Sequence, residues 1–352
     1  MKQDINFRCC DNHDVVDINT YKPMEVKLSG KEYLAYGEDN QFPQMIEGLI
    51  ENCAILGTCT DVVATYTSGA GITNDRPIDE NGMMLSELLE KLVTDYINHG
   101  AFAVQLLRNT YGELVKLAYV NVANCRLDET GDFVYYSKNW GKYTRSVKKY
   151  SRWNLKNVEP NSIMYVKNQK TKGIYGKPMW SSCILDANTI IEASKSNHNS
   201  IINQFQPNVL ISFNQGIPDQ DTKDEMEKAI MKKYTGSNGS KILLTWSDSQ
   251  DTAPTVEQFQ TDDYTAKYES VMTTCKNNII MAFRISEQLL GINTSQGFND
   301  IEYANSYALF YATQIRPIQD YIEKQFKKIG FDFRFNEFTV EFKTSGGNDM
   351  TM

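Results

Sequence analysis

The sequence is poor in the side chains that most often carry catalysis and metal binding. Three histidines occur in 352 residues, and there is no H-E-x-x-H, G-x-S-x-G or Walker A motif. The glycines at 69 and 71 follow an expected helix and lack the third glycine of a dinucleotide loop, so they favour a helix cap. We therefore expect no catalytic residues, no cofactor and no metal site, and an enzyme is the third hypothesis.

Long apolar runs and paired cysteines are also missing. No run approaches the roughly 18 apolar residues that a membrane helix needs, and the N-terminal residues lack the apolar core of a secretion signal. The seven cysteines are scattered and include no C-x-x-C pair, which favours free thiols in a reducing cytosol. We expect neither a membrane partner nor a disulfide framework.

The composition is that of an ordinary globular protein. Hydrophobic residues make up 41% of the chain and charged residues 23%, and the length suffices for a large core and for about two domains. The formal net charge is −8, which argues against a protein that coats duplex DNA with Lys and Arg.

The first half of the chain predicts a mixed α+β domain. A strand and a turn are expected over 31–43, and helices over 44–65 and 84–98. The second helix has the clearest amphipathic face, and it ends at His99, where a protonated histidine would favour the helix dipole. Residues 101–120 read as a hairpin of two strands.

The second half predicts long helices. The expected elements are a helix over 181–205, a β-α-β segment over 208–246, a second helix over 262–285, and a third that runs to about residue 328 and kinks near Pro317. Residues 331–342 alternate as a strand.

Residues 138–172 are unusually basic and aromatic. They contain ten Lys and Arg residues against one acid, Glu159, with two tryptophans and several tyrosines between them. Such a mixture is typical of a nucleic-acid surface, with Lys148, Lys149 and Arg152 as candidate contacts. A twisted hairpin whose lysines protect an exposed edge while its aromatics pack inward explains it as well. Both interpretations stay open.

The order of these parts resembles the portal proteins of tailed bacteriophages. The resemblance covers most of residues 31–343 and depends on the order of four stretches: YGEDNQFP at 36–43, YGKPMW at 175–180, the segment from FQPN at 205–208 to KILLTW, and NIIMAFRISEQLLGINTSQGFND with the helix that follows it. Ser286-Glu287-Gln288 stands where many relatives have a proline.

The resemblance implies a portal fold of class α+β, with an α/β wing, two long stem helices, a small β-α-β clip, a tunnel loop and a Pro-kinked long wing helix. It places the wing at 1–180, the stem helices at 181–205 and 262–285, the clip at 206–255, the tunnel loop at 286–299, the wing return at 300–345, and a disordered tail at 346–352. A helical crown is expected to be absent.

The implied function is that of a portal subunit in a homo-oligomeric ring, typically a dodecamer, at one capsid vertex. Double-stranded DNA would pass through with weak contacts, and terminase, the major capsid protein or scaffold, and head-completion or tail adaptor proteins would be partners. The ring would be assembled in the cytoplasm of the bacterial host and would remain in the virion.

The resemblance and the charge pattern together nominate site residues. The candidates for channel-facing loop residues are Asn293, Thr294, Ser295, Gln296 and Phe298. Lys267 and Lys276 on the second stem helix are candidates for weak phosphate contacts, although a solvated helix face explains them equally well. The rival function is a monomeric nucleic-acid-binding protein that acts through residues 138–172.

Overall fold

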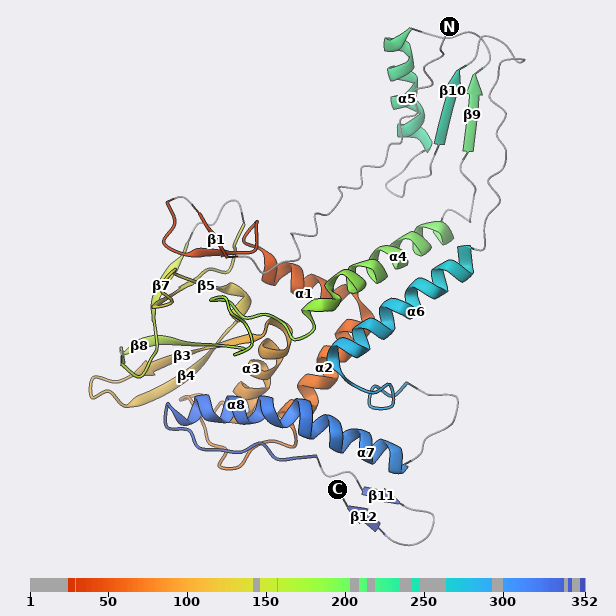
Figure 1. The fold of residues 1–352 in the computed structure, drawn as a ribbon. Coiled ribbons are helices and arrows are strands. Elements are labelled where there is room, and N and C mark those ends of the chain that lie inside the picture. The colour runs from red at the N-terminus through yellow and green to blue at the C-terminus, as the bar shows by residue number, and fades with distance from the viewer. Residues whose placement is uncertain are drawn as a thin grey trace. The chain divides into compact units, whose positions relative to one another are not determined.

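The computed structural model describes most of the chain and divides it into two units (Figure 1). One unit joins Met1–Ala187 to Asn277–Met352, and the other is Asn188–Lys276. The described residues are 25–28, 30–141, 146–156, 158–202, 209–213, 219–234, 242–246, 264–292, 300–338, 341–343 and 349–351.

A six-stranded mixed sheet forms the centre of the first unit. Its strand order is β4-β3-β8-β7-β6-β5, with β7 and β8 parallel and the other neighbours antiparallel. The strands are β3 (Ala101–Arg108), β4 (Leu114–Val120), β5 (Cys125–Leu127), β6 (Phe133–Tyr136), β7 (Lys148–Arg152) and β8 (Asn161–Lys167). The predicted hairpin is confirmed as β3 and β4, and its turn is held by the side chain of Asn109, which accepts hydrogen bonds from two backbone N–H groups.

Three helices precede this sheet in the chain. A short antiparallel pair, β1 (Glu25–Lys27) and β2 (Leu34–Tyr36), leads into α1 (Phe42–Asn52), α2 (Ala54–Ser68) and α3 (Leu85–His99). The single helix predicted over 44–65 is therefore two, because Cys53 has an extended backbone with φ −108° and ψ 101°. Both helices keep buried residues at helical spacing across the break, so the periodicity did not reveal it.

The predicted long C-terminal helix contains a wider turn just before its proline. It consists of α7 (Asp300–Phe310), a π-helical turn (Tyr311–Ile315) and α8 (Arg316–Lys327). The N–H of Arg316 donates to the carbonyl of Tyr311, five residues earlier. Pro317 has no N–H, and its ring would clash with a carbonyl four residues earlier in a regular helix, so the wider turn accommodates it.

The alternating segment after α8 is extended but is not the predicted continuous strand. Phe331, Phe333 and Phe335 are buried, and the residues between them are exposed. The backbone bonds to the loop after α2, with Asn336 N–H donating to Gly71 O and Thr73 N–H to Arg334 O. Farther on, β11 (Glu341–Lys343) pairs with β12 (Asp349–Thr351), so a strand lies within the tail predicted to be disordered.

The β-α-β segment of the second unit agrees with the prediction. Strands β9 (Val209–Phe213) and β10 (Ile242–Trp246) are parallel and are joined through α5 (Gln220–Tyr234). Two long helices, α4 (Ile184–Ile202) and α6 (Tyr264–Phe283), flank this segment in the chain. Residues 181–183 form a 3₁₀ turn instead of the first turn of α4, and α6 ends at Phe283 instead of at the predicted residue 285. The predicted helix residues 203–205 and 262–263 lie outside the described residues.

The five cysteines among the described residues are all buried, and none of them is in a disulfide. Burial raises the pKa of the Cys59, Cys125 and Cys183 thiols to about 12, so these thiols are protonated at neutral pH. None of the helices in the described part of the chain combines the length and the apolar character that crossing a membrane requires.

Two ionisable side chains are buried on α3, one turn apart. Asp95 accepts hydrogen bonds from the Tyr119 hydroxyl at 3.0 Å and from the Val122 N–H at 3.3 Å, which ties α3 to β4 and to the turn that follows β4. Burial raises the pKa of Asp95 to about 7.

His99 differs from the protonated helix cap expected from the sequence. It is 4% exposed, and burial, together with the charge of Arg126, lowers its pKa to about 4. Its Nε2 lies 3.8 Å from the Glu47 carboxylate. The imidazole is therefore neutral near pH 7, so it carries no positive charge that could interact favourably with the helix dipole.

Stability should fall as the pH rises from about 4 to about 8, because the Asp95 carboxyl ionises in the unfolded chain at a lower pH than in the folded one. Its folded pKa lies above the unfolded value, so its contribution is complete below the unfolded pKa and is lost as the pH rises through 7. Asp95→Asn should remove a penalty on the order of 4 kcal/mol at pH 8.5. Melting temperatures across this range test it.

The matched control is Glu90→Gln, which removes an exposed carboxylate from the same helix. It should keep the wild-type pH dependence. Below pH 6.5 the depressed pKa of His99 acts in the opposite direction, because its loss of stability grows as the pH falls through 4. The test is therefore the difference between wild type and Asp95→Asn, which both carry His99. Equal pH slopes for wild type and Asp95→Asn would contradict the assignment.

Candidate functional site

The five candidate loop residues, Asn293, Thr294, Ser295, Gln296 and Phe298, lie outside the described residues. The chain just before them is folded into tight turns. Leu289 N–H donates to Ser286 O, and Gly291 N–H donates to Gln288 O. Leu289 is buried, so the described start of the predicted loop 286–299 is anchored to the core of the first unit.

The two candidate lysines of α6 occupy different faces of the helix. Positions 267 and 276 are nine residues apart, which is two and a half turns of about 3.6 residues, so they lie on opposite sides. Lys276 is half-buried beside the buried Cys275. Positions 267 and 276 therefore do not share one face of α6.

The three candidate cations of β7 are also divided. Side chains alternate between the faces of a strand, so Lys148 and Arg152 share one face and Lys149 occupies the other. The strand lies between β6 and β8, inside the sheet. The expectation that these lysines protect an exposed sheet edge is therefore wrong for β7.

A carboxylate that precedes β2 in the chain holds the Lys149 side chain in place. Its ammonium group lies 2.9 Å from the Glu32 carboxylate and 4.3 Å from the centre of the Phe133 ring. The hydrogen bond from Lys149, with one from Tyr135, lowers the pKa of Glu32. Because both partners are largely exposed, the pair adds little stability.

Arg152 has mainly a structural environment. It is half-buried and donates to the backbone carbonyls of Gly131 at 3.1 Å and Tyr165 at 3.0 Å. Burial lowers its pKa, but an arginine side chain stays charged at neutral pH. Its guanidinium thus links the turn before β6 to β8.

At least one aromatic side chain of the basic segment belongs to the core. Trp140 is 3% exposed, packs edge-on against Tyr33 at 4.9 Å between ring centres, and donates its indole N–H to Asn124 O. This inward packing supports that part of the hairpin interpretation and removes Trp140 as a platform for base stacking.

Arg126 is a central residue that sequence reasoning missed. It is fully buried, and its five N–H groups each have an oxygen acceptor. Nε donates to Asn40 Oδ1 at 2.5 Å, Nη1 to the carbonyls of Ala123 and Cys125 at 2.8 Å, and Nη2 to Asn40 O at 2.7 Å and to Gln44 Oε1 at 3.4 Å. No carboxylate is among these partners.

The motif YGEDNQFP supplies much of this environment. Asn40 has a left-handed backbone with φ 63°, and its Oδ1 also accepts the Tyr36 N–H. Arg126 lies 4.8 Å from the centre of the Trp140 ring and 5.7 Å from that of Tyr36. The motif was a sequence signal, but nothing in the sequence connected it with an arginine 86 positions later.

Metal-binding clusters were sought among the residues that the structure describes. No group of three or more His, Cys, Asp or Glu side chains in that part of the chain could hold a metal ion.

A family model described as "Phage portal protein" matches residues 67–350, which is more than half of the chain. Comparison with the curated proteins gives no significant match.

Solved structures of similar fold include components of gene transfer agent (GTA) particles. The neck of an empty GTA particle, computed with C6 symmetry, matches with a TM-score of 0.54 at 11% identity, covering 84% of this chain and 85% of that chain. The neck of a native GTA particle, computed with C12 symmetry, gives 0.53 at 13% identity, with 83% and 84% covered. An HK97 family phage portal protein from Corynebacterium diphtheriae gives 0.46 at 12% identity, with 82% and 94% covered.

Replacing Arg126 with methionine should destabilise the first unit by about 3 kcal/mol, because the carbonyls of Ala123, Cys125 and Asn40 and the Asn40 amide would lose a buried donor. Arg126→Lys, which has three donors and no planar fork, should destabilise it less but clearly. Chemical denaturation followed by tryptophan fluorescence measures this, since Trp140 lies against Arg126.

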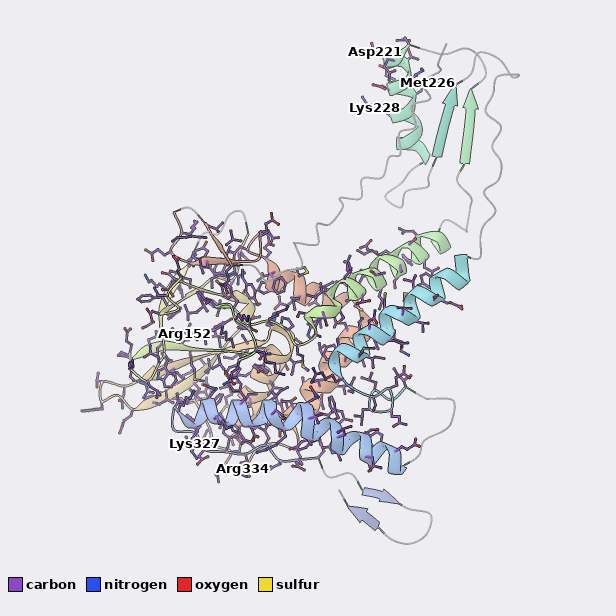
Figure 2. The ribbon with its side chains drawn as sticks, in the orientation of Figure 1. Arg152, Asp221, Met226, Lys228, Lys327 and Arg334 are labelled. Carbon is purple, nitrogen blue, oxygen red and sulfur yellow. The ribbon has the colours of Figure 1, made fainter. Side chains whose placement is uncertain are left out.

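Arg334→Lys is the control, because Arg334 is exposed and its substitution should change stability by less than about 0.5 kcal/mol (Figure 2). If Arg126→Met were as stable as this control, Arg126 would not hold the loop.

Proposed function

The chain belongs to the phage portal protein family, and we propose that copies of it form the ring-shaped DNA channel at one vertex of a phage-type capsid. As a member of this family, it is a structural protein and not an enzyme. The observation that carries the proposal is the family match over residues 67–350. The likeness in fold to two neck structures supports it, since each covers more than four fifths of this chain.

The ring would be homo-oligomeric and would lie in the neck of the virion. The two similar neck structures were computed with C6 and C12 symmetry, and a ring of twelve copies is compatible with both. Terminase, the major capsid protein or scaffold, and head-completion or tail adaptor proteins would be the partners.

The parts of the chain would divide the work as follows. The first unit, with its six-stranded sheet, would be the wing; α4 and α6 would be the stem helices, and β9, α5 and β10 the clip. This assignment is supported by chain order, because a small β-α-β segment lies between two long helices. The segment between α6 and α7 would be the tunnel loop.

Contacts with DNA would be weak. A net charge of −8 on each copy repels phosphate on average, which suits a channel through which DNA slides. Lys267 and Lys276 would touch phosphates from different faces of α6. Lys149 and Arg152 already contact Glu32 and backbone carbonyls, so the structure does not favour the rival function through residues 138–172.

The native mass of the purified chain tests self-assembly. Twelve copies of 40.2 kDa would give a particle of about 480 kDa, with a central hole in negative-stain images. Light scattering at two protein concentrations distinguishes a closed ring from open-ended association. A monomer that binds DNA tightly at moderate salt would contradict the ring and support the nucleic-acid-binding rival.

Deleting 293–298 tests the tunnel loop. The ring should keep its native mass, because Leu289 anchors the chain before the deletion, while DNase-protected DNA in assembled particles should fall severalfold. A variant with six Gly and Ser residues in place of 293–298 keeps the length and separates the effect of the side chains from that of the connection. Normal packaging by the deletion variant would contradict the loop assignment.

A further inference from the structure

A cleft of about 680 Å³ opens in the first unit beside the six-stranded sheet. Its lining comes from the start of β6, the end of β7 with the residues that follow it, the middle of β8, and the end of α8 with Lys328 just beyond it. The volume is in the usual range of ligand pockets. Arg152, labelled in Figure 2, lies on its sheet side.

Positive charge predominates in the cleft. Arg152, Lys156 and Lys328 line it, against one carboxylate, that of Asp132. Lys156 and Lys328 are exposed, and the Lys328 ammonium is placed by a 2.7 Å hydrogen bond to Gln325 Oε1, which also lines the cleft. Three cations from two distant parts of the chain thus surround a single space.

The same lining is apolar and aromatic. Phe133 is 37% exposed, and Leu155 is 70% exposed although it is a leucine. Met164 and Val166 add buried apolar surface. The indole nitrogen of Trp153 is buried and has no hydrogen-bond partner among the described residues. A buried N–H without an acceptor is costly.

We propose that this cleft binds a segment of a partner protein that carries carboxylates next to a bulky apolar side chain. The carboxylates would meet Lys156 and Lys328, and the apolar side chain would cover Leu155 and Trp153. Charge complementarity favours this chemistry, because three cations face one acid. The proposal concerns a surface of the first unit and does not depend on the proposed channel.

An acidic, apolar segment fits better than a nucleic acid. Nucleic-acid surfaces are polar and strongly positive, with cations that follow the phosphates. Here an exposed leucine lies between Arg152 and Lys156, and an acid stands in the same lining. Aromatic residues together with arginine around an apolar centre are typical of protein-binding surfaces.

A random library of 12-residue peptides, selected on the purified full-length protein, tests the proposal. Enriched peptides should carry Asp or Glu within two or three residues of an aromatic or large aliphatic side chain. The binding of an enriched, tryptophan-free peptide should change the tryptophan fluorescence of the protein, and this change should vanish in Trp153→Phe.

Substitutions in the cleft should weaken the same peptide. Lys156→Glu with Lys328→Glu should raise its Kd at least tenfold, and Leu155→Ser about threefold to tenfold. The matched control is Lys138→Glu with Lys170→Glu, which reverses two exposed lysines outside the cleft and should leave the Kd within twofold. Circular dichroism and melting temperature confirm that each variant is folded.

Several results would overturn the proposal. The first is a selection without an acidic and apolar consensus, and the second is equal weakening by the control pair. Displacement of the peptide by a short oligonucleotide at the same site would favour a nucleic acid. A lower native mass for the Lys156→Glu, Lys328→Glu variant would show that the cleft holds a second copy of this chain.

Discussion

The first unit is built around a buried guanidinium group. Each N–H of such a group needs a hydrogen-bond acceptor, because it has lost its contact with water. Arg126 is fully buried without a carboxylate partner, so neutral oxygens alone compensate for its loss of water. These oxygens come from the loop before α1, from α1 itself, and from the turn that leads into β5. Fixing one side chain therefore fixes the positions of three segments relative to the sheet, and the aromatic rings of Trp140 and Tyr36 close around it.

Features with a strong local signal could be predicted from the sequence. The leucines of α3 repeat at helical spacing and face the core, and the turn of the β3–β4 hairpin has polar residues at each end of Tyr111 and Gly112. The parallel β-α-β segment followed from two apolar strands around a charged helix. In each case the residues that decide the structure are close together in the chain, so their spacing is sufficient.

Features that depend on distant neighbours could not be predicted. Basic and aromatic residues were counted along 138–172, but the strand places them on two faces and buries Trp140. The partner of Lys149, Glu32, lies far away in the sequence. The resemblance gave the family, whereas composition alone left a nucleic-acid surface and a structural hairpin equally open. Arg126 escaped notice because a lone arginine in a sequence reads as a surface residue.

The π-helical turn at Tyr311–Ile315 rotates the side-chain positions of α8 about the helix axis relative to those of α7, within one continuous helix. An extra residue in a turn sets the side chains after it back by about 100° relative to an unbroken α-helix. Before the turn, Tyr307 packs against Tyr66 of α2, and after it, Tyr321 packs against Tyr96 of α3 while Phe326 packs against Phe102 of β3. A single helix thereby presents one set of aromatic side chains to α2 and a rotated set to α3 and β3.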